Sequence, residues 1–372
     1  MYVRRSVPGT DGTEGTNCGH VPKKDDPRNG KGSEDAMACQ AGIRSGDPHV
    51  SMSCAFRLRA GSMTGRDPIP SLEFRGRLIV HVGIHKTGTT SIQGALDAGY
   101  QQLRDNGILY PKAGRAQKDG IVEALHHPLI KSLIDEEDRT ALSRIEALQS
   151  EIHDASPSTV ILSSEVLSRE NLSSQVFRDI QTIFPDASRT WVIYLRRQDQ
   201  LAMSRYAEGI KVGLVAWPDG VRHTLQPSYL DHRLRLERLQ YAVGHDMIVP
   251  VSFDAAKTRL MASFFEAAGL EMTGTLPSAR HANASLPWGT LQLLRLANAL
   301  PGSGKRFARR AVYALNRRIS PTRARRMLDW SKPLSPRQAA DVCKRYESSN
   351  LWVEDTFWNE CRFLTVSEQD VS

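Results

Sequence analysis

The sequence predicts an α/β protein in which a central parallel sheet of four or five strands is flanked by helices and the C-terminal portion is mostly helical. Four short apolar runs, without regular polar alternation, are separated by segments of helical periodicity. Strands of this kind are typical of a parallel sheet that is covered on both faces. An α+β domain with mixed strand pairing is the alternative.

The predicted strands and helices alternate along the chain. The apolar runs that predict strands lie at 77–83, 158–165, 189–196 and 246–253. Helical patterns between them cover 89–106, 143–154, 173–184 and 199–211. The last third adds helical patterns at 286–300, 305–318 and 335–357. This order is expected for a sheet whose parallel strands are joined by crossover helices.

The chain is expected to contain one ordered domain. Residues 1–74 are rich in Gly, Ser, Asp, Lys and Pro and lack hydrophobic periodicity, so this tail is expected to be disordered. Met52 or Met63 is an alternative start of the natural protein. The ordered domain is predicted at 75–365, and 366–372 form a short tail.

The net charge and the cysteine content indicate what kind of ligand and what cellular setting to expect. The 372 residues carry a net charge of +8, which suits an anionic ligand or substrate. Five scattered Cys are too few for a disulfide framework, and a reducing, cytoplasmic setting is expected. The sequence contains no run of 18 apolar residues that would predict a membrane span, and no spacing of Cys and His that would predict a metal site.

The stretch "HVGIHKTGTT" at 81–90 follows the first predicted strand directly. Gly83 and Gly88 permit close backbone approach, and the predicted helix that starts near Thr89 offers unpaired N–H groups to an anion. Lys86 adds a mobile positive charge. Strand, loop and helix in this order predict a phosphate cradle, although a plain Gly/Thr turn with a solvated lysine is the simpler interpretation.

The cradle differs from the common nucleotide-binding loop. Gly83 and Gly88 have the spacing of G-x-x-x-x-G-K-[ST], but Thr89 stands where the lysine belongs. The later strands end in Glu and Arg rather than in the Asp that helps to hold Mg²⁺. The loop is therefore expected to hold a phosphate without being organised around a metal-bound triphosphate.

"HKTGTTS" at 85–91 resembles the 5′-phosphosulfate loop of the P-loop sulfotransferases, whose donor is 3′-phosphoadenosine 5′-phosphosulfate (PAPS). The loop of that family runs approximately P-K-[ST]-G-T-[ST], and His85 replaces the usual Pro. The resemblance covers about residues 76–365 and implies a P-loop NTPase-like fold. It implies that Lys86 acts on the leaving group and that the donor is bound by Lys86, Thr87, Gly88, Thr89, Thr90 and Ser91.

A second element of the family is an Arg at a strand end with a Ser eight residues later, which together bind the 3′-phosphate. Arg196 and Ser204 have this spacing. An Arg at the carboxyl end of a parallel strand and a Ser on the following helix face the same crevice. Arg197 is either a second ligand or a surface residue.

The catalytic base is the third element. In carbohydrate sulfotransferases of this fold a Glu just after a central strand takes the proton of the acceptor, and Glu165 stands in that position. A helix N-terminal Glu that only complements the dipole is the alternative. His126 and His127 are competing candidates for the base, because relatives that act on small phenols and alcohols use His.

Two later segments could contribute further contacts. Arg280, Asn283 and Ser285 resemble a stretch that closes over the donor, although Ser285 is equally suited to cap a helix. The stretch 304–326 carries nine Lys/Arg and no acid, which suits an anionic glycan or membrane surface. A solvated helical hairpin is the simpler interpretation of this stretch, and no nucleic acid is expected as a partner.

The prediction is thus a PAPS-dependent sulfotransferase, with Lys86 and Glu165 as catalytic residues and no metal requirement. The acceptor is expected to be a hydroxyl- or amine-bearing small molecule, glycan or lipid. The alternatives are an ATP-dependent kinase or other P-loop NTPase with a variant loop, and a non-catalytic nucleotide- or glycan-binding protein.

Overall fold

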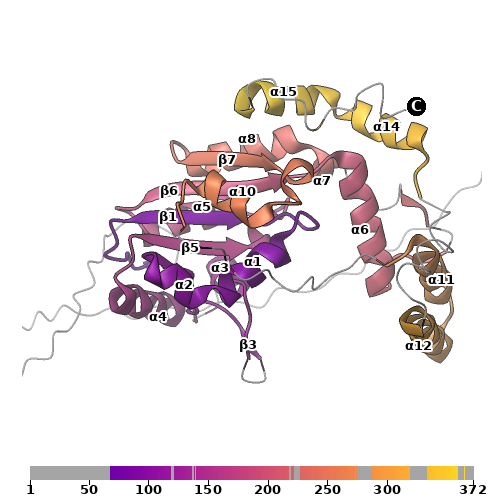
Figure 1. Ribbon diagram of the computed structural model, residues 1–372, viewed down its shortest axis with the longest axis horizontal. Coiled ribbons are helices and arrows are strands. Elements are labelled where there is room, and N and C mark those ends of the chain that lie inside the picture. The colour runs from indigo at the N-terminus through magenta and orange to yellow at the C-terminus, as the bar shows by residue number, and fades with distance from the viewer. Residues whose placement is uncertain are drawn as a thin grey trace, which may run out of the picture. The chain divides into compact units, whose positions relative to one another are not determined.

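The central sheet has five strands, all parallel, in the order β2-β5-β1-β6-β7 (Figure 1). The strands are β1 Arg77–Val82, β2 Ile108–Leu109, β5 Thr159–Ser164, β6 Ser188–Leu195 and β7 Met247–Ser252. The predicted α/β class with a parallel sheet is confirmed, and the mixed α+β alternative is wrong. The short edge strand β2 was not predicted, because two residues carry no periodicity. A separate antiparallel pair joins β3 Gln117–Lys118 to β4 Ile121–Val122.

The computed structural model describes part of the chain: residues 68–118, 121–135, 138, 140–217, 219–221, 227–272, 274, 276, 286–318, 333–358 and 364. All of these belong to the unit that spans residues 55–372. Residues 1–67 of the expected tail therefore lie outside the described residues, and so does the expected short tail 366–372. Leu72 and Phe74 are buried in the core, just before the predicted domain start at 75. The domain limits stay predictions.

Both faces of the sheet are covered, which explains why its strands do not alternate with polar residues. In β1, Leu78, Val80 and Val82 belong to one buried cluster, and Ile79 belongs to another on the opposite face. The first cluster receives side chains from the helices at 127–134, 140–155, 174–183, 198–212 and 232–243, and the second from the helices at 89–98, 100–105 and 260–268. A strand at the centre of such a sandwich buries every apolar side chain it has.

The helices predicted from the sequence are found in the predicted order, but 89–106 and 335–357 are each divided into two helices, and the helices at 127–134, 232–243 and 260–268 were not predicted. The helices are α1 Thr89–Ala98, α2 Tyr100–Asp105, α3 His127–Ile134, α4 Thr140–Ala155, η1 Glu165–Ser168, α5 Ser174–Ile183, α6 Gln198–Val212, α7 Pro227–Leu230, α8 His232–Val243, α9 Phe253–Ala256, α10 Leu260–Ala268, α11 Trp288–Asn298, α12 Gly302–Arg318, α14 Pro336–Arg345 and α15 Glu347–Phe357. The predicted helix 89–106 is two helices, because α1 ends at Gly99. The helical C-terminal portion is confirmed. In the described part of the chain no helix has the length and apolar character that a membrane crossing requires.

The strand order decides where a ligand can bind. After β1 the chain moves to the β2–β5 side of the sheet, and after β5 it crosses to β6 on the other side of β1. The connections therefore diverge at the carboxyl ends of β1, β5 and β6, and such a point in an open parallel sheet leaves a crevice between loops. The loop 83–88 follows β1, Glu165 follows β5, and Arg196 follows β6.

Candidate functional site

The loop after β1 is held in shape by its own hydrogen bonds. The hydroxyls of Thr87 and Thr89 both donate to the carbonyl of Ile84, at 2.8 and 3.1 Å, and both side chains are buried. These hydroxyls are therefore engaged within the loop, and the Thr87 amide also donates to the Ile84 carbonyl, at 3.3 Å, so the donor left to a ligand is the backbone amide of Thr89. Lys86 has φ 72°, a conformation that a non-glycine residue rarely adopts and that points to a functional constraint.

The N-terminus of α1 is open. Its N-cap, Gly88, has φ 78° and supplies no side-chain cap, and the first turn holds no acid. The amides of Ser91 and Ile92 donate to the Gly88 carbonyl. Within the described residues, no acceptor is found for the amides of Gly88, Thr89 and Thr90. An uncapped, positively polarised helix end of this kind favours an anion, and on its first turn Thr90 is exposed and Ser91 is partly exposed.

Gly88 cannot be replaced without strain, which gives a prediction about stability. A Cβ at this position would lie 2.7 Å from Leu260 Cδ2 and 2.8 Å from Phe253 Cε2, and its φ is positive. We expect Gly88→Ala to lower the free energy of unfolding by about 2–3 kcal/mol, as measured by urea denaturation.

Gly213→Ala is the matched control for this variant. Gly213 also has a positive φ, but an added Cβ there meets no atom closer than 3.5 Å. Its cost should be limited to the backbone term of about 1–2 kcal/mol. Equal losses in the two variants would show that Gly88 is not packed against α9 and α10 as described.

Lys86 points toward α6. Its Nζ lies 3.1 Å from Glu208 Oε2, and Lys211 Nζ lies 4.0 Å from the same oxygen. Ser204, Glu208 and Lys211 are spaced four and three residues apart, so they share one face of α6. Because Glu208 on this face contacts Lys86, the face that carries Ser204 is turned toward the loop.

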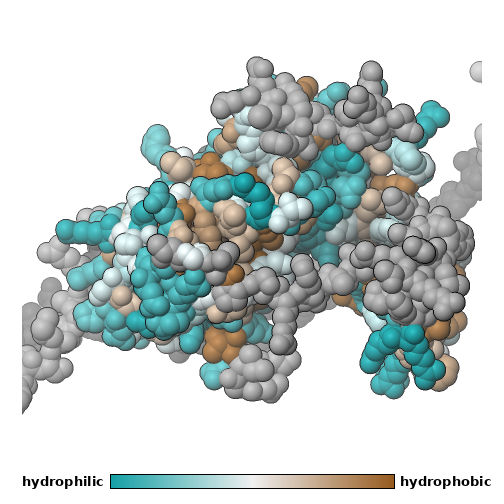
Figure 2. All heavy atoms as spheres, in the orientation of Figure 1, coloured by the Kyte–Doolittle hydropathy of each residue, from teal (hydrophilic) through white to brown (hydrophobic). Residues whose placement is uncertain are grey.

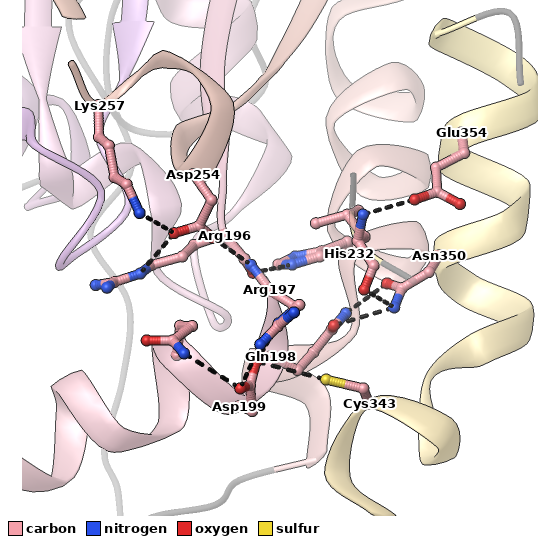
Figure 3. A network of polar contacts seen from close by, with 12 residues as sticks. Arg196, Arg197, Gln198, Asp199, His232, Asp254, Lys257, Cys343, Asn350 and Glu354 are labelled. Atoms are coloured by element: carbon pink, nitrogen blue, oxygen red, sulfur yellow. Dashed lines mark hydrogen bonds and ion pairs between the residues drawn. The ribbon is translucent and has the colours of Figure 1, made fainter. Parts of the chain in front are cut away.

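Arg196 joins the end of β6 to the same loop. Its Nη1 donates to the carbonyl of Lys86 at 3.0 Å. Its Nε lies 3.7 Å from Asp254 Oδ1 on α9, as Figure 3 shows. Burial lowers the pKa of this guanidinium, while Asp254 and Asp199 act in the opposite direction. Its buried Nε has no hydrogen-bond partner among the described residues. A desolvated cation with donor capacity to spare, beside an open helix end, suits a phosphate.

The turn that carries Arg196 is supported by the C-terminal helices. Gln198 and Asn350 exchange two side-chain hydrogen bonds of 2.6 and 3.0 Å, and Cys343 Sγ donates to Asp199 Oδ1 at 3.5 Å (Figure 3). Asp199 in turn holds Arg197 through a 2.8 Å ion pair. These contacts hold residues 196–199 in place. The side chain of Arg197 is bound by Asp199 as part of this arrangement.

Glu165 lies at the start of η1, where the cap is its neighbour Ser164, whose hydroxyl accepts from the Val166 amide. His85 Nδ1 is 2.9 Å from Glu165 Oε2. Burial raises the pKa of Glu165, but the hydrogen bond from His85 and the charges of His85 and His127 outweigh it and hold the pKa below its ordinary value of 4.5. The carboxylate is therefore ionised at neutral pH and able to accept a proton.

The two candidate histidines have different surroundings. His126 is fully buried, donates from Nε2 to the Pro111 carbonyl at 2.9 Å and accepts the Ser163 amide on Nδ1 at 3.2 Å. Both of its nitrogens are thus used, and burial lowers its pKa to about 3. His127 is half-buried, and its Nδ1 lies 3.1 Å from the Ser164 hydroxyl. Only His127 keeps a nitrogen that could serve a substrate.

The structure gathers most of the predicted residues at one edge of the sheet. Lys86, Glu165 and Arg196 follow three neighbouring strands, and Ser204 lies on the helix face turned to the loop. Arg280, Asn283 and Ser285 lie outside the described residues, as do residues 319–326 of the basic stretch. In the described ranges no group of three or more His, Cys, Asp and Glu could hold a metal.

Sequence reasoning missed the partners that hold the predicted residues. His85 pairs with Glu165, Glu208 with Lys86, and Asp254 with Arg196. Only Glu208 left a signal, since it lies one helical turn after Ser204. The other two partners come from loops or helices whose approach depends on the folded sheet.

No protein-family model matches the chain, and no curated protein matches it either. The solved structures to which the chain is similar include the following two. One is a sulfotransferase from Alicyclobacillus acidocaldarius, at 13% identity and a TM-score of 0.34, covering 67% of this chain and 98% of that one. The other is a sulfotransferase domain from the curacin biosynthetic pathway, at 9% identity and a TM-score of 0.36, covering 74% of this chain and 98% of that domain. Both are sulfotransferases. What the site of this chain can do follows from its own residues.

Proposed function

We propose that the protein is a sulfotransferase that moves a sulfuryl group from PAPS to a hydroxyl or amine acceptor. The observation that carries the proposal is the meeting of three groups at one sheet edge. Lys86 lies beside an open helix N-terminus, Arg196 is bonded to the same loop, and an ionised Glu165 follows the neighbouring strand. A phosphate cradle with a base beside it suits group transfer to an acceptor.

The residues present fit a bisphosphorylated nucleotide. The free amides of residues 88–90 would bind the 5′-phosphosulfate, together with Thr90 and Ser91 on the first turn of α1. Arg196 at the end of β6 and Ser204 on α6 would bind the 3′-phosphate. Binding of the donor would draw Lys86 from Glu208, because the phosphate offers it a stronger anion than a half-exposed carboxylate.

The chemistry assigned to the chain is proton transfer and charge stabilisation. Glu165 takes the proton of the acceptor hydroxyl as that oxygen bonds to sulfur, and the bond between sulfur and the bridging oxygen breaks. Lys86 neutralises the charge that develops on the departing phosphate oxygen. Positioning and fixed charge supply the catalysis, so the proposed reaction does not call for a metal ion.

Binding of the donor product is the first test. At 100 times its dissociation constant, adenosine 3′,5′-bisphosphate should add about 2.7 kcal/mol of stability. We expect the thermal unfolding midpoint to rise by about 5–10 °C, and the rise to be lost in Arg196→Ala. Arg178→Ala, an exposed arginine on α5, is the control and should retain it.

The competing functions give different outcomes in the same measurement. Stabilisation by ATP with Mg²⁺ but not by the bisphosphate would replace the proposal with a kinase or another NTPase. Absence of a shift with either ligand would favour a protein that binds neither nucleotide. Stabilisation by the bisphosphate leads on to a screen of hydroxyl- and amine-bearing small molecules, glycans and lipids as acceptors.

A further inference from the structure

Within the part of the chain that the structure describes, the polar contacts between α12 and the rest of the domain run mainly to the C-terminal end of α6. Arg309 on α12 donates to the carbonyls of Ile210 and Lys211, and Lys305 donates to that of Gly213, so two cations cap the C-terminus of α6. Asn298 on α11 donates to the Ile210 carbonyl at 2.9 Å. These polar contacts define the inner side of the hairpin.

The outer side of the hairpin exposes large apolar side chains. Leu293 and Leu296 on α11, and Leu300 two residues after its end, recur at helical spacing and are all exposed, Leu296 at 51%. On α12, no residue is buried, and Phe307 is 77% exposed. Five large apolar side chains are exposed on the hairpin, and together they define what we call the hairpin face: Leu293, Leu296, Leu300, Phe307 and Leu315. A soluble monomer rarely gathers so many without a function.

Positive charge accompanies these apolar groups. Residues 286–318 contain seven Lys/Arg and no Asp or Glu. Four of the seven are exposed on α12 and pair with no carboxylate among the described residues: Arg306, Arg310, Arg317 and Arg318. At the place of α12 in Figure 2, lower right, hydrophilic atoms lie directly beside hydrophobic ones.

We propose that the hairpin face docks on an anionic membrane surface. An exposed helix that combines Phe and Leu with unpaired arginines is suited to lie at the lipid boundary, because the apolar groups enter the acyl region while the guanidinium groups reach the headgroups. The charge is complementary, since the cytoplasmic leaflet is negative and attracts clustered Lys and Arg. The inference is independent of the reaction proposed above.

Two other occupants fit less well. A nucleic acid would use the arginines but would leave the leucines and Phe307 exposed to water. A second copy of the chain, related by two-fold symmetry, would bring the same arginines against one another without an acid to pair with them. A lipid surface satisfies both the charge and the apolar groups.

Vesicle flotation of the full chain tests the proposal. We expect binding to vesicles of phosphatidylcholine with one quarter phosphatidylserine, and little binding to phosphatidylcholine alone. The triple variant R306Q/R310Q/R317Q should bind about 100-fold less, since each arginine near the surface contributes roughly fivefold. The variant L296Q/F307Q should lose about tenfold or more while its charge is unchanged.

A matched triple variant controls for net charge. R337Q/K344Q/R345Q removes three exposed charges from α14 and should change binding at most about threefold. Equal losses in the two triple variants would overturn the proposal, and so would absence of binding by the unmodified chain. A dimer in light scattering that L296Q/F307Q dissociates would assign the hairpin face to a second copy instead.

Discussion

Replacing Lys86 with glycine is expected to reduce the rate of sulfuryl transfer by about 10³-fold, because the charge that stabilises the departing phosphate oxygen is removed. Glycine is the informative replacement, since Lys86 has φ 72° and an alanine there would keep the backbone strain that glycine relieves. The fold should be retained or slightly stabilised, so a loss of activity cannot be attributed to unfolding. Steady-state kinetics and thermal unfolding on the same preparation measure both quantities.

Two further variants define what the lysine contributes. Lys86→Arg keeps the charge and should recover part of the rate, whereas Lys131→Ala removes an exposed lysine on α3 and should leave the rate unchanged. A Lys86→Gly protein with normal turnover would place the leaving-group contact elsewhere. Lys211 would then be the next candidate, because it faces the same Glu208 carboxylate.

Replacing Glu165 with glutamine is expected to reduce turnover by about 10²–10⁴-fold while the affinity for adenosine 3′,5′-bisphosphate stays the same. The side chain keeps its size and can still bond to His85, so only the ability to accept a proton is removed. Glu123→Gln, which changes an exposed glutamate, is the control and should not affect turnover.

The pH profile distinguishes Glu165 from His127 as the base. Burial raises the pKa of Glu165, but the His85 hydrogen bond and the nearby histidines lower it by more than burial raises it, so the folded-state pKa lies below 4.5. The rate should therefore be constant near neutrality and fall only as the pH drops through that lower value. His85→Ala removes the strongest stabilising contact and should move the fall to higher pH. A fall at a pH above 4.5 that disappears in His127→Asn would make His127 the base instead.

The same shift has a consequence for stability. Because the pKa of Glu165 is lower in the folded chain than in the unfolded chain, its contribution to stability is present above 4.5 and is lost as the pH falls through the folded-state value. His81 and His232 add to this acid sensitivity, since burial lowers the pKa of each to about 4. Their unfolded forms take up protons near pH 6.5, whereas the folded forms do not.

Local patterns in the sequence determined much of the fold. The apolar runs that became β1, β5, β6 and β7 are long enough to be recognised without tertiary information, and Gly83 and Gly88 mark the loop between β1 and α1. The two-residue strand β2 and the end of α1 at Gly99 were not recognisable, because each depends on what packs against it. Short elements carry too few residues for a periodicity to form.

The residues of the candidate site were proposed from the sequence, and their partners came only from the tertiary structure. Lys86, Arg196 and Glu165 each follow a strand, and a parallel sheet places such positions at one edge. Their place after the predicted strands was therefore enough to suggest them. The contact of Lys86 with Glu208 spans 122 residues, and that of Arg196 with the Lys86 carbonyl spans 110. Helical or strand periodicity does not extend over such separations. Those contacts, and the lowering of the Glu165 pKa by His85, were decided by how the helices and loops pack on the finished sheet.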